Sequence, residues 1–239
     1  MTPPFDAPRA TAGYLATLAD LGGYFTLSVA SAQQQWRPLP ELFGDSVLTG
    51  HVEATRSAIA AAAGCESTEV PVRMAASSFH LGVAARLLSP VIGAAVCSGA
   101  VPVLDAAAVR WRPADTHAPQ FAVASPEWRP AGAATIVDTV VQVLVELGCR
   151  LEALASLSSR VTLGNITSAS NGAVTVLAMS RPQSEAAGRA LVSQLLALEP
   201  LTGTGSFAGD RFRRNSCCLY YQRPGGMLCG DCVLIPATR

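Results

Sequence analysis

The chain has 239 residues, of which half are apolar and only 14% are charged. Its 17 basic residues, all of them arginines, balance 17 acidic residues, so the formal net charge is zero. This composition excludes an extended disordered chain, and the neutrality excludes a global field that would recruit nucleic acid or an anionic membrane surface.

Three helices are predicted in the first ninety residues. The first covers residues 11–19 and follows a proline-rich start that does not resemble a secretory signal. The second, residues 52–63, is rich in alanine and ends before a glycine, a residue typical of that position. The third, residues 77–88, begins at a serine and is expected to end or kink at Pro90.

Residues 87–104 form a long stretch without charged residues. Two prolines and two glycines interrupt it, so it is poorly suited to cross a membrane as one helix. We expect a buried pair of helices with a break between them and no integral membrane span. The protein is therefore expected to be cytoplasmic, where clustered cysteines favour metal or redox chemistry over structural disulfides.

The middle of the chain mixes irregular and helical patterns. Residues 109–130 hold two tryptophans and four prolines and are expected to form a hairpin or a long loop. Residues 134–147 place apolar side chains on one broad helical face, which Gly148 is expected to close. Residues 161–178 contain an Asn-Gly pair and predict either two short strands or a broken helix. Another helix is predicted over residues 185–198.

Composition changes near residue 200, beyond which glycine, arginine and cysteine become frequent. We therefore expect a mainly α fold. A helical body of residues 1–208 would carry a small irregular or hairpin-like C-terminal module of residues 209–239.

Four of the seven cysteines fall within 16 residues and form a C-C-x10-C-x2-C pattern: Cys217, Cys218, Cys229 and Cys232. The sequence Pro224-Gly225-Gly226 lies between the two pairs and predicts a chain reversal that brings them together. Four thiolates at one point repel one another unless a cation binds them. The pattern therefore predicts a metal centre.

Three identities are open for this centre. A [2Fe–2S] cluster takes four cysteine ligands, and its width suits the diverging side chains of adjacent cysteines. A structural zinc ion also takes four cysteines, although two separated C-x2-C pairs are its usual pattern. A pair of disulfides is the third reading. The other cysteines lie in apolar helical sequence and are expected to be core residues: Cys65, Cys97 and Cys149.

The segment RRNSCCLYYQRPGGMLCGDC resembles the C-terminal signature of the ferric-siderophore reductase family named after FhuF. Two upstream segments, which begin at Ser77 and Val161, are similar to the helical body of that family. The resemblance implies that the C-terminal module is an iron–sulfur module. The ligands of its [2Fe–2S] cluster would be Cys217, Cys218, Cys229 and Cys232.

The resemblance also implies an activity. The cluster would reduce the iron of a ferric siderophore, of the hydroxamate type, by one electron, and Fe(II) would be released in the cytoplasm. Because the sequence has neither a Walker loop nor a strand–GxGxxG–helix unit, the electrons are expected from an external donor such as a ferredoxin or a flavoprotein. No catalytic acid or base is expected, since electron transfer followed by ligand exchange needs none.

Further residues are candidates for tuning or for substrate contact. Positive charge beside the cluster would stabilise its reduced form, which is the role expected of Arg211, Arg213 and Arg214 unless they form a solvated surface. His80 and Arg86 could face the substrate, although a histidine on an apolar helix is more often a core residue.

Two other functions remain open. The same four cysteines could bind zinc in a protein that binds the chelate without reducing it. Alternatively, gain or loss of the cluster could change a partner interface in an iron or redox sensor.

Overall fold

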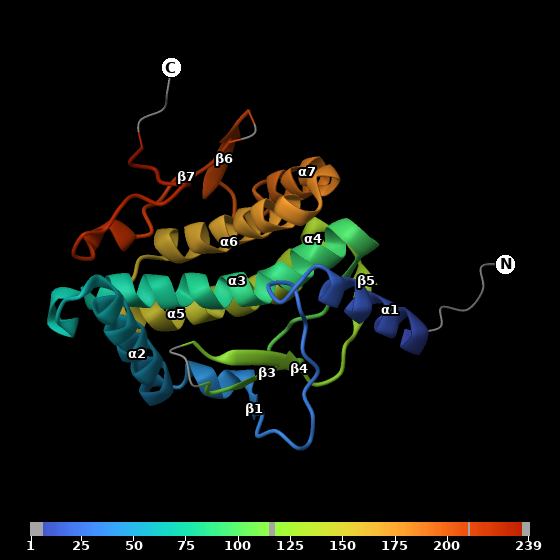
Figure 1. The fold of residues 1–239 in the computed structure, drawn as a ribbon, viewed down its shortest axis with the longest axis horizontal. Coiled ribbons are helices and arrows are strands. Elements are labelled where there is room, and N and C mark those ends of the chain that lie inside the picture. Colours follow the sequence, from blue (N-terminus) through green and yellow to red (C-terminus); the bar gives the residue numbers. More distant parts are fainter. Residues whose placement is uncertain (1–6, 115–117, 210, 236–239) are drawn as a thin grey trace.

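The computed structural model describes residues 7–114, 118–209 and 211–235. It is mainly helical, as predicted, and the long helix α3 (Val72–Ser98) runs through its centre (Figure 1). The other α-helices pack around α3 or its neighbours: α1 (Ala7–Asp20), α2 (Asp45–Ala63), α4 (Ala133–Ile136), α5 (Gln142–Ala155), α6 (Ser159–Ser180) and α7 (Glu185–Leu195). The structure also has short 3₁₀ or π segments: η1 (Leu39–Phe43), η2 (Ser67–Glu69), η3 (Val137–Val141), η4 (Pro182–Ser184) and η5 (Tyr220–Gln222).

Helix α3 is continuous, so the predicted break at Pro90 is wrong. A proline inside a helix loses one hydrogen bond, but here both faces of the helix are packed against neighbours, and this burial offsets the loss. Gly93 serves close packing instead of a break, because a Cβ there would lie 2.8 Å from Cδ1 of Phe25. The helix ends at Gly99, which adopts the left-handed conformation typical of a C-terminal cap.

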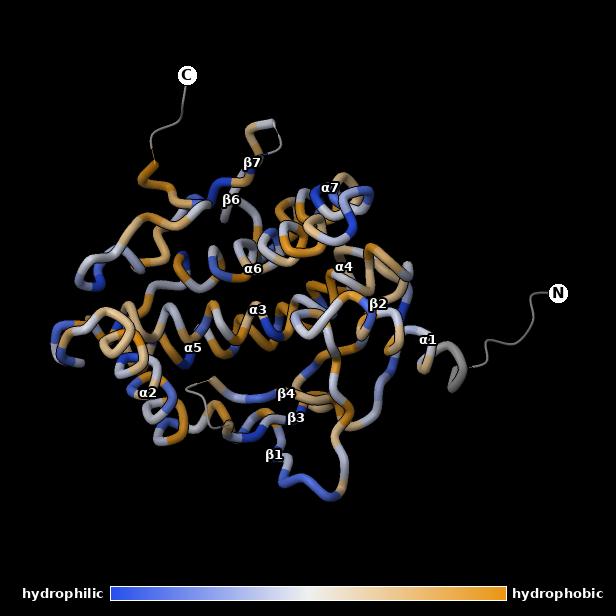
Figure 2. The backbone as a smooth tube through the Cα atoms, in the orientation of Figure 1, coloured by the Kyte–Doolittle hydropathy of each residue, from blue (hydrophilic) through white to orange (hydrophobic). Residues whose placement is uncertain are grey.

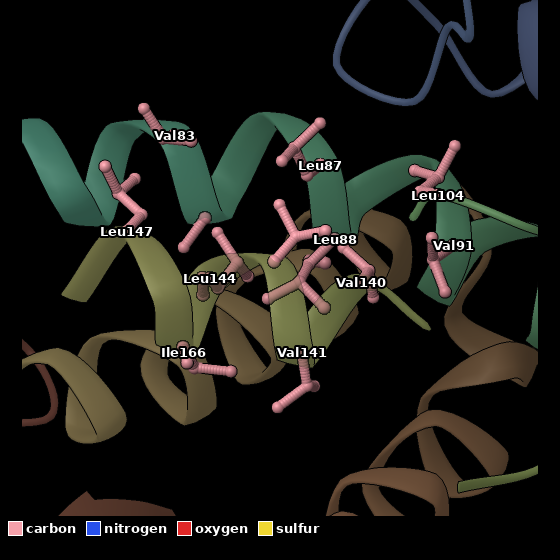
Figure 3. Packing of buried hydrophobic residues seen from close by; sticks show 14 of the residues in the cluster. Val83, Leu87, Leu88, Val91, Leu104, Val140, Val141, Leu144, Leu147 and Ile166 are labelled. Atoms are coloured by element: carbon pink, nitrogen blue, oxygen red, sulfur yellow. The ribbon is translucent and has the colours of Figure 1, made fainter. Parts of the chain in front are cut away.

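Among the described residues, α3 is the helix whose length and hydropathy would suit a membrane span. It is also the core helix. Leu88 points toward α5, Val83 and Leu87 lie on the opposite side of α3, and Ile166 of α6 lies beyond α5 (Figure 3). The apolar character of α3 is therefore used inside the protein, and this fits a soluble protein.

Helix α5 passes through Gly148, which was expected to close it, and ends at Ala155. A Cβ on Gly148 would lie 2.8 Å from Oγ1 of Thr162, so this glycine permits close contact between α5 and α6. The predicted end is therefore wrong, because the glycine serves packing between helices.

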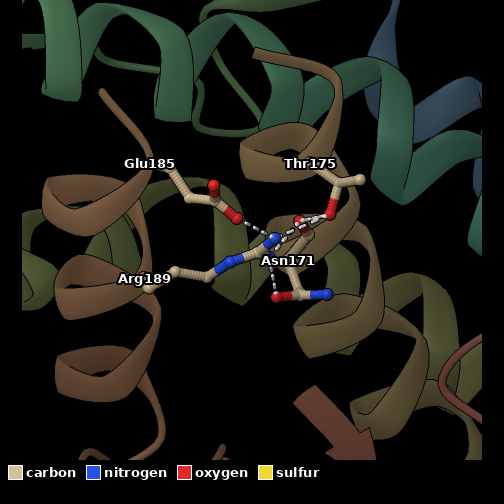
Figure 4. Close-up of polar contacts among 4 residues, drawn as sticks. All are labelled: Asn171, Thr175, Glu185 and Arg189. Carbon is tan, nitrogen blue, oxygen red and sulfur yellow. Dashed lines mark hydrogen bonds and ion pairs between the residues drawn. The ribbon is translucent and has the colours of Figure 1, made fainter. Parts of the chain in front are cut away.

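Helix α6 is a single helix through the Asn-Gly pair, so neither the predicted strands nor the predicted break is present. Asn171 is buried, and its side chain accepts a hydrogen bond from Arg189 of α7 (Figure 4). The same guanidinium contacts Oγ1 of Thr175 at 3.1 Å and Oε1 of Glu185 at 3.0 Å. Contacts between helices thus override the local turn signal.

Small antiparallel sheets complete the fold. The region 109–130 contains the predicted hairpin, in which β3 (Val109–Arg112) pairs with β4 (Gln120–Val123). Strand β3 also pairs with β1 (Arg37–Pro38), at the end of a hydrophilic loop seen in Figure 2. The remaining strands form two pairs: β2 (Ala100–Pro102) with β5 (Trp128–Pro130), and β6 (Gly205–Ala208) with β7 (Arg211–Arg214).

Candidate metal centre

The hairpin β6–β7 begins the region that carries the cysteines and lies beside α6 (Figure 1). Its strands approach closely because Gly205 has no side chain, and a Cβ there would lie 2.7 Å from the ring of Phe212. After β7 the chain leaves the body, turns, and returns along the same strand. The backbone N–H of Arg214 donates to the carbonyl of Asp231 at 3.1 Å and joins the outgoing and returning segments.

The predicted reversal between the cysteine pairs is confirmed. Helix η5 is followed by a turn in which the N–H of Gly226 donates to the carbonyl of Arg223 at 2.8 Å. Gly225 has a φ of 65°, a left-handed conformation that favours glycine. The Sγ atoms of Cys218 and Cys229 consequently lie 3.6 Å apart, although eleven positions separate them in sequence.

The four thiols differ in exposure. Cys218 and Cys232 are buried, whereas Cys217 and Cys229 are partly exposed. Backbone N–H groups support two of the sulfurs: Leu219 donates to Sγ of Cys217 and Leu234 to Sγ of Cys232, each at 3.4 Å. Hydrogen bonds of this kind stabilise the thiolate form that binds metal.

The spacing of the sulfurs bears on the identity of the metal. Two thiolates that share one tetrahedral ion with bonds of about 2.3 Å are about 3.8 Å apart, which is close to the Cys218–Cys229 separation. Within the described part of the chain, no three side chains of the metal-binding types are arranged around a single ion. The Cys218–Cys229 separation fits two thiolates that share one metal ion, and in a [2Fe–2S] cluster each iron takes two cysteines.

All seven cysteines are free, so the disulfide reading is wrong. A hydrogen bond from Cys229 lowers the pKa of Cys218 to about 6, and the nearby charge of Arg214 acts in the same direction. The pKa of Cys229 is correspondingly raised, chiefly by that hydrogen bond, and burial raises the pKa of Cys217. One thiol of the Cys218–Cys229 pair is therefore readily deprotonated. Deprotonation of the second thiol requires a cation that neutralises the added negative charge.

Arg214 is a buried cation beside these thiols. Its side chain is 1% exposed, and its Nη2 donates to Oδ1 of Asn165 at 2.8 Å and to the carbonyl of Val161 at 3.2 Å. Among the described residues, no carboxylate lies within 4.0 Å of it, and its Nε has no hydrogen-bond partner. Burial lowers the pKa of Arg214, and the cysteines and Asp231 oppose that shift. A buried cation without a paired acid fits an anionic cluster held by four thiolates.

A chain of hydrogen bonds connects Arg214 with the backbone of the cysteine pair. Asn165 of α6 donates from Nδ2 to the carbonyl of Ser77 at 3.0 Å. Ser77 of α3 donates from Oγ to the carbonyl of Cys218 at 2.9 Å. A separate contact anchors the second pair, because Oγ of Ser168 donates to Asp231 at 2.6 Å. No sequence pattern pointed to these serines or connected Asn165 with the cysteines. The one feature of these residues that the sequence shows is that they are polar within otherwise apolar helices.

The other candidate residues occupy different surroundings. Arg211 is exposed, and Arg213 donates to the carbonyl of Val233. His80 is fully buried, with Nε2 3.0 Å from the carbonyl of Leu144, and burial lowers its pKa to about 4. This position fits a neutral core residue and not a substrate contact. Arg86 is exposed and lines two cavities on the far side of α3 from α5.

Comparison with protein families gives one finding. Residues 214–234 match the FhuF 2Fe-2S C-terminal domain, and this segment contains all four clustered cysteines. Comparison with curated proteins gave no match. The matched domain and the cysteine pattern together point to a [2Fe–2S] cluster as the cofactor.

Proposed function

We propose that this protein is a ferric-siderophore reductase in the cytoplasm. Its four clustered cysteines would hold a [2Fe–2S] cluster that supplies single electrons to chelated Fe³⁺. The observation that carries the proposal is the four-cysteine set within the matched domain, with two of its sulfurs partly exposed. Siderophores bind Fe³⁺ through hard oxygen donors, so addition of one electron weakens the complex and releases Fe(II).

The residues around the cysteines have distinct roles in this proposal. The N–H groups of Leu219 and Leu234 orient two thiolates, and the guanidinium of Arg214 offsets the negative charge. Asn165 and Ser77 hold the cysteine backbone against the helical body. No proton transfer by a side chain is required. Ligand exchange at iron follows the electron.

The two parts of the chain would have different functions. We propose that residues 1–208 bind the chelate and that residues 209–239 hold the cluster. Strand β6 lies just before this boundary and pairs with β7 just after it, so the hairpin connects the two parts. Exposed apolar side chains of the second part offer a surface for an external electron donor such as a ferredoxin or flavoprotein: Tyr221, Met227, Leu228 and Leu234.

The test is a single-turnover experiment without oxygen. Dithionite-reduced protein is freed of excess reductant and mixed with a ferric siderophore in the presence of an Fe(II) trap. The proposal predicts reoxidation of the cluster, in step with one trapped Fe(II) per cluster. Cys229→Ser should abolish both signals, whereas Cys149→Ser, which alters an exposed thiol outside the cluster segment, should leave them unchanged.

One result would overturn the reductase proposal. If the reduced cluster persists with the chelate but is reoxidised by a small outer-sphere oxidant, the cluster is redox-active without reducing siderophore iron. The sensor reading would then be favoured.

A further inference from the structure

Two cavities adjoin on the face of the helical body that reaches the cluster module. The smaller has a volume of about 300 Å³ and lies among α2, α3 and η5, with Tyr220 in its wall. The larger, of about 910 Å³, lies between the loop before β1 and the hairpin β3–β4. Both are lined by Arg86, Ala118 and Pro119, so the two form one continuous binding surface.

In the described part of this surface, the charged side chains are all basic. Among the described residues, neither wall contains an aspartate or a glutamate, although acidic and basic residues are equally frequent in the chain. The charged side chains in the walls are Arg86, common to both cavities, and Arg112 in the larger one. In the described part of the chain, no carboxylate lies within 4.0 Å of either guanidinium. The described part of the surface therefore favours anions.

Aromatic rings flank the arginines. The guanidinium of Arg112 lies over the ring of Trp36, 4.9 Å from its centroid, and its Nε donates to Oε1 of Gln120 at 2.8 Å. Phe121 and Tyr24 line the same cavity. Because a guanidinium held in this way presents its remaining N–H groups in one plane, the site suits oxygen donors on a rigid and partly aromatic ligand.

The position of the surface connects it with the cluster module. Tyr220 is two residues beyond Cys218, and the intervening Leu219 packs against the apolar cluster of Ala60, Val70 and Met74. On α3, Ser77 binds the carbonyl of Cys218, and the next residue, Ser78, lines the smaller cavity. A ligand seated there would lie beside the part of α3 that anchors the cysteine segment.

We propose that these joined cavities bind a ferric chelate of net negative charge, such as one with catecholate or carboxylate donors. This inference rests on the proposed function, and it differs from the neutral or cationic hydroxamate complexes that the family resemblance implies. Arg86 and Arg112 contact the anionic oxygens, and the aromatic rings pack against the body of the chelate.

Binding is measured on the oxidised holoprotein, so that no electron transfer takes place. The probes are a ferric tris-catecholate and a neutral ferric tris-hydroxamate, and quenching of tryptophan fluorescence reports their dissociation constants, since Trp36 lies in the wall. The anionic chelate should bind at least about tenfold more tightly. Arg86→Gln and Arg112→Gln should each weaken its binding by about tenfold and change that of the neutral chelate by less than about twofold.

Two controls separate charge from structure. Arg86→Lys should restore most of the affinity that Arg86→Gln loses. Arg150→Gln, which removes an exposed arginine of α5 outside both walls, should bind the anionic chelate as the unaltered protein does. Equal affinity for the two chelates, or unchanged affinity in both glutamine variants, would overturn the assignment.

The outcomes distinguish this site from the reductase proposal. If the anionic chelate binds in the arginine-dependent way but no Fe(II) forms from the reduced protein, the site stands and the reductase proposal fails. If Fe(II) forms at the same rate from both chelates and in all arginine variants, the reductase proposal stands and the chelate binds elsewhere.

Discussion

At the scale of single residues, the centre depends on contacts that sequence spacing predicts only in part. The C-C-x10-C-x2-C pattern located the four thiols because their chemistry follows from local spacing. The bond between Ser77 and Cys218 joins residues 141 positions apart, and no local pattern indicates it. The three arginines looked alike in sequence, but the structure buries Arg214 and exposes Arg211.

Replacement of Arg214 by glutamine should lower the midpoint potential of the cluster. A unit charge about 6 Å away, at an effective dielectric of about 20, contributes about 3 kcal/mol, or on the order of 100 mV for one electron. Solvent does not screen this side chain. A potentiometric titration measures the shift.

Two further variants show whether the shift in potential comes from the charge of Arg214. Arg214→Lys keeps the charge and should recover most of the potential. Arg211→Gln removes an exposed charge and should shift it far less. An unaltered midpoint in Arg214→Gln, with the cluster still bound, would show that Arg214 has a structural role alone.

His80 should make the folded protein sensitive to acid. Burial, with a smaller effect from Arg214, lowers its pKa from 6.5 to about 4, so the unfolded chain binds a proton that the folded protein rejects between these values. The free energy of unfolding therefore falls as the pH decreases from 6.5 to 4, by about 2 kcal/mol at pH 5 from this group.

Denaturant unfolding at pH 7 and pH 5 tests this expectation. His80→Gln retains an N–H donor for the carbonyl of Leu144 but does not titrate. The loss between the two pH values should be smaller in the variant by about 2 kcal/mol. Equal losses in the two proteins would mean that His80 is not the group responsible.

At the scale of elements, the predictions that failed were helix ends or breaks placed at glycine and proline. Pro90, Gly148 and the Asn-Gly pair of α6 were expected to interrupt helices, yet α3, α5 and α6 pass through them. At Gly148 the missing side chain allows a neighbouring helix to approach, and this information lies in tertiary packing. Amphipathic helices without such signals, such as α7, were predicted to within a few residues.

Two glycines of α6 offer a matched comparison. A Cβ on Gly164 would collide with Oγ of Ser216 and lie 2.9 Å from Nη2 of Arg214, whereas one on Gly172 would meet no atom within 4 Å. Gly172→Ala should raise the free energy of unfolding by about 0.5–1 kcal/mol, since alanine favours helix. Gly164→Ala should instead lower it and reduce the iron content per chain.

Thermal unfolding measures the stability of the two alanine variants, and iron analysis measures how much cluster each one binds. The contrast is specific to the contact between α6 and the cysteine segment, because both changes are made in the same helix. If the two alanine variants behave alike, the close approach at Gly164 does not support the centre.

At the scale of the whole molecule, we propose that the helical core carries a small module that depends on the metal. The mainly α class followed from composition and apolar periodicity, and the core around α3 bears it out. The module has few buried apolar residues of its own and is attached through Arg214, Ser77 and Ser168. How the module attaches could not be predicted, because each of these contacts joins distant segments.

Removal of the cluster should loosen the module without unfolding the body. Chelator-treated protein is expected to keep its far-ultraviolet circular dichroism, because the core does not include the metal centre. Chymotrypsin should cleave it much faster after Tyr220, Tyr221 or Leu228, which are exposed in the module. Loss of helicity together with the cluster would contradict this division.

The most direct test of the account is the metal content and electron paramagnetic resonance of protein purified without oxygen, before and after one-electron reduction. We expect two irons and two sulfides per chain, as a [2Fe–2S] cluster requires, no resonance in the oxidised form, and a spin-one-half signal on reduction. Cys232→Ser should lose the signal and Cys149→Ser should retain it. A colourless protein with one zinc ion per chain and no signal would contradict the account.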